Sequence, residues 1–236
     1  MTTTTPLPHV VLLPGMDGTD ALFGPLCAAL AGFATAQPVV LPQGGDQSYE
    51  QLLPHVLAAV AAAGPCLVLG WSFSGPLALL AAERRPDLVR GVILVATFVT
   101  PPMDWLPWVR PILRGPLWAL VRVVRRLPLW LLRANDDPLR VAKARIWREV
   151  PARVLAARAR SLAVVDVRQT LRNCRTPLLY LQSTADRVVR RHHLARIHAL
   201  RADVRVQTLP GGHFALFTAA GNAATAIHDF ATSSHP

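Results

Sequence analysis

Short apolar runs alternate along the chain with longer stretches whose apolar residues recur at helical spacing. The runs show no alternation of apolar and polar residues, which is typical of strands in a parallel sheet covered on both faces. They lie at His9–Pro14, Pro38–Pro42, Cys66–Gly70, Gly91–Thr97, Pro177–Gln182 and Val204–Leu209. The pattern predicts an α/β fold with a mostly parallel sheet of about six strands and helices on both faces.

Helices are expected between these runs. Ser48 and Gln51 have the spacing of a capping box, so a helix should begin at the residue after Ser48. The region 51–82 carries no Asp, Glu, Lys or Arg, but Pro54 and the Gly64-Pro65 pair interrupt it, so no membrane span is predicted. The expected helices are about Leu22–Ala31, Tyr49–Ala63, Gly75–Arg85, Arg191–Leu200 and Ala215–Ala231.

The alternation fails once, between the strand ending near Thr97 and the one beginning at Pro177. This stretch of about eighty residues is rich in Trp, Pro and Arg, and it is too long for a loop. We interpret it as an inserted helical cap over the carboxyl edge of the sheet, where open α/β sheets place their sites. The predicted division is a core of residues 1–100 and 165–236 with a cap of residues 101–164.

Length and charge add to this picture. A chain of 236 residues, 52% of them hydrophobic, has the size and apolar content of one domain with a buried core. The net charge is +11, and residues 101–160 hold 13 basic and 4 acidic side chains. Such a basic cap could meet an acidic carrier protein or an anionic membrane surface, or it could reflect arginine-rich composition. No nucleic-acid-binding motif accompanies the charge, so nucleic acid is not expected.

The cysteines and the first residues bear on the cellular compartment. Cys27, Cys66 and Cys174 are few, odd in number and without metal-ligand spacing, so neither a disulfide framework nor a metal site is predicted. The first residues lack the basic segment of a signal peptide. We therefore expect a protein of the reducing cytoplasm without a transmembrane segment.

One strand runs into a tight turn and directly into a helix, over residues 69–78. A serine on so sharp a turn needs small residues two positions before and after it, and Gly70 and Ser74 meet this need around Ser72. Ser74 is a rival nucleophile, but the proline at 76 suits the first turn of a helix better than an elbow. The turn resembles the nucleophile elbow of α/β-hydrolases, G-x-S-x-G, with Ser74 in place of the second glycine.

An acid and a histidine follow later strands in the order that such an elbow requires. Asp186 comes after Pro177–Gln182, and His213 lies in a glycine-flanked loop after Val204–Leu209. A neutral imidazole takes the proton of a serine hydroxyl, and the carboxylate fixes the tautomer of the imidazole. The sequence therefore predicts Ser72, His213 and Asp186 as a catalytic triad. Asp104, after an earlier strand, remains a rival for the acid.

Backbone amides should complete the site. The amide of Phe73, directly after the nucleophile, and that of Met16, in the glycine-containing loop 14–19, are the expected oxyanion donors. Tryptophans of the cap and residues beside the elbow offer an apolar acyl pocket. The residues predicted to contact substrate are Gly15, Trp71, Trp105 and Trp118.

The order of strand, oxyanion loop, elbow, cap, acid loop and histidine loop resembles the α/β-hydrolase superfamily over nearly the whole chain. Within it, residues 70–72 (GWS) and 165–171 (VDVRQTL) resemble pimeloyl-acyl-carrier-protein methyl ester esterases, capped enzymes whose basic cap receives an acidic carrier protein. The resemblance implies hydrolysis of an ester or thioester with a hydrophobic acyl group through an acyl-enzyme, without metal or cofactor. A hydrolase or acyltransferase acting on carrier-bound substrates, and a non-catalytic binding protein on the same fold, remain alternatives.

Overall fold

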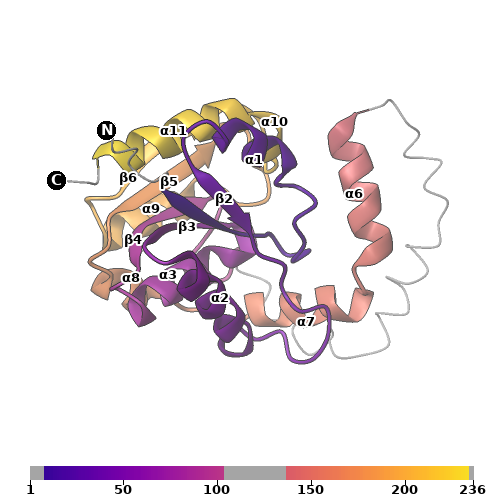
Figure 1. Ribbon diagram of the computed structural model, residues 1–236. Coiled ribbons are helices and arrows are strands. Elements are labelled where there is room, and N and C mark those ends of the chain that lie inside the picture. The colour runs from indigo at the N-terminus through magenta and orange to yellow at the C-terminus, as the bar shows by residue number, and fades with distance from the viewer. Residues whose placement is uncertain (1–7, 104–136, 234–236) are drawn as a thin grey trace.

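The computed structural model describes residues 8–103 and 137–233, and within them six strands form one sheet (Figure 1). The spatial order is β2-β1-β3-β4-β5-β6, and every neighbouring pair is parallel. The strands are β1 (His9–Leu13), β2 (Thr35–Pro38), β3 (Cys66–Trp71), β4 (Val89–Val95), β5 (Leu178–Ser183) and β6 (Arg205–Leu209). The predicted parallel sheet is confirmed.

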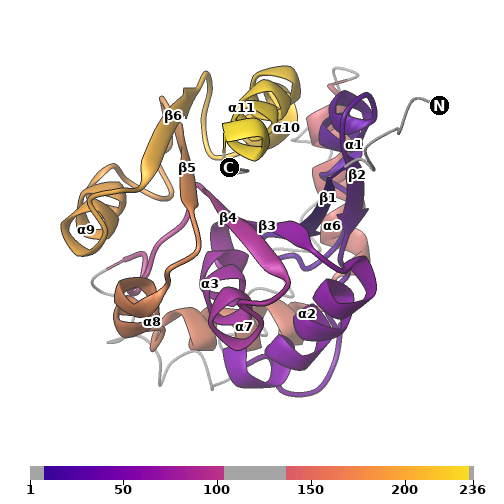
Figure 2. The same cartoon turned by 60° about the vertical axis from the view of Figure 1, so that its left-hand side comes forward.

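Helices cover both faces of the sheet, as Figure 2 shows. One face carries α1 (Gly24–Leu30), α10 (Ala215–Thr218) and α11 (Ala220–Ser233), and the other carries α2 (Tyr49–Ala63), α3 (Gly75–Arg84), α8 (Arg168–Asn173) and α9 (His192–Leu200). Two buried apolar clusters lie between the sheet and these layers. β3 is buried at all its residues because both of its faces are covered, which explains its unbroken apolar sequence.

The predicted N-cap of α2 at Ser48 is confirmed, whereas the second bond of a capping box is replaced, because the amide of Ser48 donates to Asp46 and not to the side chain of Gln51. The side chain of Ser48 accepts a hydrogen bond from the amide of Gln51 at 3.4 Å, and the helix begins at Tyr49. The carbonyl of Ser48 also accepts from the amide of Leu52, which closes the first helical turn. Pro54 lies inside the helix, in its second turn.

The second predicted strand, Pro38–Pro42, is wrong in its bounds, because β2 ends at Pro38. Val39 and Leu41 are buried in the core beyond the end of the strand, whereas Val40 between them is exposed. The apolar sequence therefore marks a buried loop. The strand itself lies at the edge of the sheet and is only partly covered, so its residues carry little hydrophobic signal.

The carboxyl half differs from the sequence pattern in two further places. β6 is exposed except at Leu209, because it is the other edge strand of the sheet. The single helix expected over Ala215–Ala231 is divided at Ala219, whose backbone leaves the helical region at φ −125° and ψ 41°. The short α10 thus begins directly after the loop that carries His213.

The strand order decides how the loops after β1 and β3 leave the sheet. From β1 the chain moves outward to β2 and then returns to β3 on the opposite side of β1. The loops after β1 and β3 therefore leave the carboxyl edge in opposite directions, which opens a crevice where α/β sheets bind ligands. Residues 14–19 and the turn η1 (Ser72–Ser74) lie at this point.

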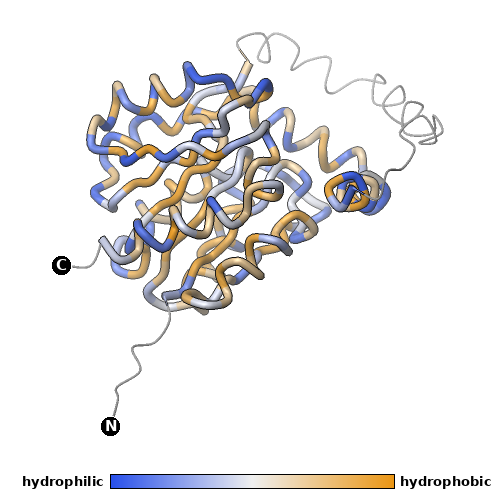
Figure 3. Tube along the Cα trace, turned by 90° about the horizontal axis from the view of Figure 1, so that it is seen from above, coloured by the Kyte–Doolittle hydropathy of each residue, from blue (hydrophilic) through white to orange (hydrophobic). Residues whose placement is uncertain are grey.

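Two helices between β4 and β5 lie over this edge: α6 (Pro138–Glu149) and α7 (Ala152–Leu162) (Figure 1). Leu139, Ala142 and Ile146 of α6 pack against the apolar cluster of the α1 face. Figure 3 shows mainly hydrophobic colouring along the inner part of the chain trace, and hydrophilic and hydrophobic colouring side by side along its outer parts. Asp104, Trp105 and Trp118 lie outside the described residues, and the domain boundaries stay a prediction.

Candidate active site

The turn after β3 holds Ser72 in a strained conformation. Its φ is 51°, in the left-handed region that side chains other than glycine rarely occupy. Gly70 is required beside it, since a Cβ there would lie 2.5 Å from the carbonyl oxygen of Ser74. The carbonyl of Ser72 accepts a hydrogen bond from the hydroxyl of Thr97, two residues beyond the end of β4. The turn is thus fixed by a close backbone approach and by the neighbouring strand.

Ser74 has a different position. It is fully buried, and its hydroxyl donates to the carbonyl of Pro14, where the loop after β1 begins. The hydroxyl thus joins the turn to the predicted oxyanion loop, and it has its own partner away from His213. This contact gives a physical reason for serine where the elbow pattern has glycine.

The three predicted triad side chains converge at the carboxyl edge. Nε2 of His213 lies 3.1 Å from the Ser72 hydroxyl, and Nδ1 lies 2.8 Å from Oδ2 of Asp186. The other carboxylate oxygen of Asp186 accepts from the amides of Val188 and Val189, at 2.7 and 2.9 Å. The Asp186 side chain is 1% exposed and that of His213 is 13% exposed. This arrangement can move a proton from the serine to the imidazole.

The environment of Asp186 keeps its carboxyl ionised. Burial opposes ionisation, but the hydrogen bond from His213, its charge and the two backbone amides outweigh burial and lower the pKa of Asp186 below its ordinary value. The carboxylate is therefore negative at neutral pH. It can hold a proton on Nδ1 of His213 and leave Nε2 free to accept one.

The loop after β1 lies beside the elbow in a defined turn. The amide of Gly18 donates to the carbonyl of Gly15 at 3.0 Å, and Asp17 accepts from the amide and the hydroxyl of Thr19. Within residues 8–103 and 137–233, the amide of Met16 donates to no protein group. An amide without a protein acceptor can serve a substrate oxygen.

Two predicted substrate contacts lie next to these groups. Trp71 is 2% exposed and packs against Phe23 and Phe214, with ring centroids 6.0 and 5.9 Å away. Its indole nitrogen is buried without a partner among the described residues. Gly15 lies in the oxyanion loop. Their contact with substrate stays a prediction.

The structure adds a cation that the sequence did not single out as a site residue. The ammonium of Lys143, in α6, lies 3.7 Å from the ring centroid of Phe214, which in turn packs edge-on against His213. Burial lowers the pKa of Lys143, and the charge of Asp137 partly offsets this. Lys143 stands out in the sequence as the single lysine of the chain, but no sequence pattern places it beside the loop that carries His213.

A buried tyrosine also supports the elbow. The hydroxyl of Tyr180, in β5, donates to the carbonyl of Thr97 at 2.9 Å and accepts from its amide at 3.2 Å. Burial raises the pKa of Tyr180, so the hydroxyl keeps its proton. Tyr180 thus fixes the backbone of Thr97, whose hydroxyl donates to the Ser72 carbonyl.

We expect Tyr180→Phe to lower the free energy of unfolding by about 1–3 kcal/mol, because both backbone groups of Thr97 would be left buried without a partner. Urea unfolding followed by tryptophan fluorescence measures this loss. Thr225→Val is a suitable control, because its exposed hydroxyl contacts only its own helix. An unchanged unfolding midpoint for Tyr180→Phe would contradict this account.

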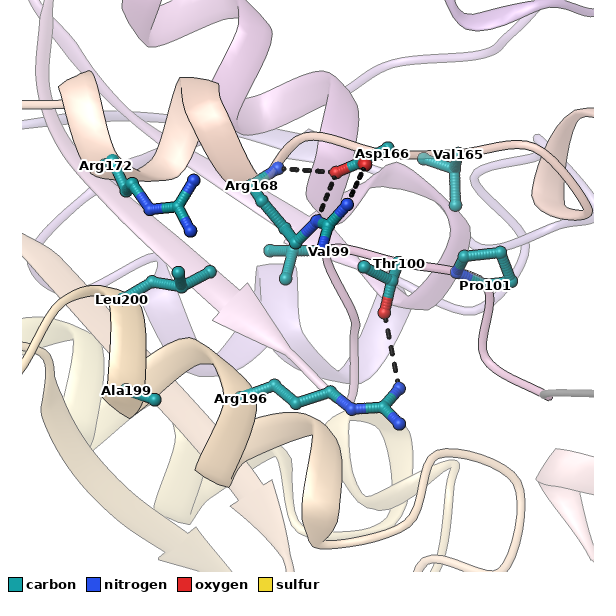
Figure 4. Close-up of a pocket in the computed structure, with 10 residues that line it drawn as sticks. All are labelled: Val99, Thr100, Pro101, Val165, Asp166, Arg168, Arg172, Arg196, Ala199 and Leu200. Carbon is teal, nitrogen blue, oxygen red and sulfur yellow. Dashed lines mark hydrogen bonds and ion pairs between the residues drawn. The ribbon is translucent and has the colours of Figure 1, made fainter.

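A hollow of about 620 Å³ lies elsewhere, between α8 and α9 (Figure 4). Arg168, Arg172 and Arg196 line it, but Arg168 is bound to Asp166 and Arg196 donates to Thr100. Ser72, Asp186 and His213 do not line this hollow. The catalytic geometry, rather than the size of the cavity, therefore defines the candidate site.

The described residues hold neither a metal cluster nor a disulfide. Among residues 8–103 and 137–233, no group of three or more His, Cys, Asp or Glu side chains is arranged to hold a metal ion. Cys27, Cys66 and Cys174 are all free thiols. Over the same part of the chain, the helices are too short or too polar to cross a membrane.

Comparison with known proteins identifies the family. Residues 47–218 match the family model described as serine aminopeptidase, S33. Two relatives are pimeloyl-[acyl-carrier protein] methyl ester esterases. That of Xanthomonas campestris (strain B100) is 29% identical over 94% of each chain, and that of Xanthomonas oryzae (strain MAFF 311018) is 31% identical over 89% of each. The enol-lactonase structure from Burkholderia xenovorans LB400 superposes with a TM-score of 0.77 at 17% identity, covering 98% of this chain and 93% of that one. The chain therefore belongs to the α/β-hydrolases, in the serine aminopeptidase S33 family.

Proposed function

We propose that the protein is a serine hydrolase that cleaves a carboxylic ester or acyl thioester with a hydrophobic acyl group. The observation that carries this proposal is the continuous hydrogen-bonded series from the Ser72 hydroxyl through His213 to the buried Asp186. The esterase names of the relatives agree with it. A protein that only binds ligands has no need for a strained serine aligned on an imidazole.

In the proposed reaction each group has one role. The Nδ1–H of His213 donates a hydrogen bond to the Asp186 carboxylate and keeps its proton, while Nε2 takes the proton of Ser72 as the serine oxygen forms a bond to the acyl carbonyl carbon. The amides of Met16 and Phe73 hold the negative charge that develops on the carbonyl oxygen. The imidazolium then gives its proton to the departing alkoxide or thiolate, which leaves an acyl-serine. A water molecule, deprotonated by His213, attacks the carbonyl carbon of this ester. The imidazolium then returns the proton to the Ser72 oxygen as its bond to the acyl carbon breaks, which releases the carboxylic acid and regenerates the serine.

A fluorophosphonate probe tests this assignment directly. We expect covalent labelling of the wild-type protein at Ser72, located by mass spectrometry of the peptide that contains residues 72 and 74. Ser72→Ala should abolish labelling. Failure of the wild type to react, in a protein that hydrolyses no ester or thioester of a panel graded by acyl length, would favour the non-catalytic binding protein.

A carrier-bound substrate is the second candidate, and the charge of α6 and α7 favours it. The exposed basic side chains of the described cap residues are Arg140, Lys143, Arg145, Arg148 and Arg153. Arg145 pairs with Glu149, whereas Arg148 donates to the carbonyl of Ala144, four residues back, and makes no ion pair within residues 8–103 and 137–233. The apolar side of α6 faces the core, so its outer side can meet an acidic carrier protein. An anionic membrane surface would be attracted by the same charges.

We expect Arg148→Glu combined with Arg153→Glu to leave hydrolysis of a small neutral ester unchanged and to lower kcat/KM on a carrier-bound ester. The loss should shrink as salt rises, because salt screens exposed charges. Arg84→Glu with Arg90→Glu makes the same change in net charge, at the end of α3 and the start of β4. An equal loss of kcat/KM in both double variants would indicate a nonspecific effect of net charge. No loss in either would mean that the arginines only solvate the surface.

A further inference from the structure

Arg158 of α7 is fully buried, which is rare for an arginine. Its guanidinium donates three hydrogen bonds: to the side-chain oxygen of Gln47 at 2.9 Å, to the carbonyl of Met16 at 3.0 Å and to the carbonyl of Pro42 at 2.8 Å. A buried cation is costly unless such contacts replace its hydration. Each acceptor belongs to the core, so one cap side chain joins separate core loops.

Arg158 contacts the predicted oxyanion loop, residues 14–19, at two residues. Besides holding the Met16 carbonyl, the guanidinium packs on Gly18, where a Cβ would collide with it. Gly18 in turn donates its amide to the carbonyl of Gly15. That carbonyl and the Met16 amide belong to one planar peptide unit. Fixing Met16 and Gly18 therefore fixes the direction of the amide expected to bind the substrate oxygen.

The second expected donor is also near this guanidinium. The Cζ atom of Arg158 lies 5.9 Å from the ring centroid of Phe73, within range of a cation–π contact. Tyr49 stacks on the same ring, with centroids 4.9 Å apart, and its hydroxyl donates to the Phe73 carbonyl at 3.0 Å. Arg158 thus contacts both residues whose amides form the expected oxyanion hole.

Arg158 keeps its charge in this environment. Burial lowers the pKa of Arg158 to about 10, and the carboxylate of Asp17 opposes this shift. The side chain stays protonated at neutral pH and can donate all its hydrogen bonds. Ser161, one turn further along α7, donates to the carbonyl of Gln47 at 2.8 Å and secures the same helix without touching the oxyanion loop.

We propose that Arg158 is a positioning residue through which the cap helix α7 sets the oxyanion hole. The inference rests on the proposed function, because an oxyanion hole has meaning only for acyl transfer at Ser72. It extends that function by placing a determinant of turnover in the cap, outside the triad and outside both amide donors. Docking of α7 would then be a condition for efficient catalysis as well as for covering the site.

Arg158→Met and Arg158→Lys test the proposal, with Ser161→Ala as the matched control on the same helix. We expect kcat for a small ester to fall about 10- to 100-fold in Arg158→Met, less than the loss of a whole oxyanion donor, with KM changed by less than about threefold. Affinity for a trifluoromethyl ketone, which forms a tetrahedral oxyanion on the serine, should fall in parallel. Ser161→Ala should retain the kcat of the wild type.

Two further measurements separate positioning from a general loss of structure. The pH dependence of kcat/KM should keep its shape in the Arg158 variants, because the guanidinium contacts neither His213 nor Asp186. Added methylguanidinium should restore part of kcat in Arg158→Ala, whereas equal sodium chloride should not. If Arg158→Met does not fold, Arg158→Lys and this rescue still decide the question.

The proposal is overturned if the Lys and Met variants both keep kcat within twofold of wild type, or if the Ala variant is inactive and shows no rescue. Loss of the proposed function itself looks different. In that case the wild type would hydrolyse no ester and would not react with the fluorophosphonate, whatever residue stands at 158.

Discussion

Ser72→Ala should lower kcat for a nitrophenyl ester by roughly 10⁵–10⁶-fold, because the reaction would lose the atom that forms the acyl-enzyme. His213→Ala should cause a comparable loss. The double variant should be little worse than either single variant, since the two side chains act as one unit at 3.1 Å. Steady-state kinetics at saturating ester, on protein whose unfolding midpoint matches the wild type, measures these effects.

Ser74→Ala is the informative comparison for this prediction. Its hydroxyl holds the carbonyl of Pro14 and has no contact with His213, so we expect a stability loss of about 1 kcal/mol and a far smaller effect on kcat. If Ser72→Ala keeps most of its activity while Ser74→Ala loses it, the nucleophile has been assigned to the wrong serine.

Much of the fold could be predicted because central parallel strands are buried on both faces. β3 is apolar and buried throughout for this reason, and β1, β4 and β5 each contain a run of at least four buried apolar residues. The residues just beyond the ends of these strands include Ser72 and Asp186. Parallel strands bring their carboxyl ends to one edge, so the order of motifs alone placed candidate side chains near one another. Edge strands lack this double burial, which explains the misplaced β2.

The contacts that α6 and α7 make with the rest of the protein could not be predicted in the same way. Arg158 is one arginine among many in an arginine-rich segment, and its sequence neighbours give no sign that it is buried. Its partners Met16 and Gln47 lie more than 100 positions earlier in the chain. Lys143 likewise meets Phe214 only through the packing of α6. Such contacts depend on how an inserted segment folds back, which local pattern does not encode.

Asp186→Asn should lower kcat by about 10³–10⁴-fold while the protein stays folded. The amides of Val188 and Val189 bind one oxygen of Asp186, and an asparagine oxygen can still accept both. The amide nitrogen would then face Nδ1 of His213, which would have to accept rather than donate a hydrogen bond. The proton would move to Nε2, where the imidazole can no longer take the proton of Ser72. Asp203→Asn, which changes an exposed carboxylate paired with Arg201, is the matched control.

The same substitution predicts a change in stability with pH. The folded-state pKa of Asp186 is lowered, so its ionisation stabilises the fold above the pKa of the unfolded chain, and this contribution is lost as pH falls through the folded-state pKa. Asp186→Asn should therefore reduce the free energy of unfolding at neutral pH and make it less sensitive to acid, as measured by urea unfolding at several pH values.

Asp104→Asn should lower turnover far less than Asp186→Asn. A large loss in Asp104→Asn with near-normal turnover in Asp186→Asn would instead identify Asp104 as the catalytic acid, and the 2.8 Å contact between Asp186 and His213 would then have only a structural role.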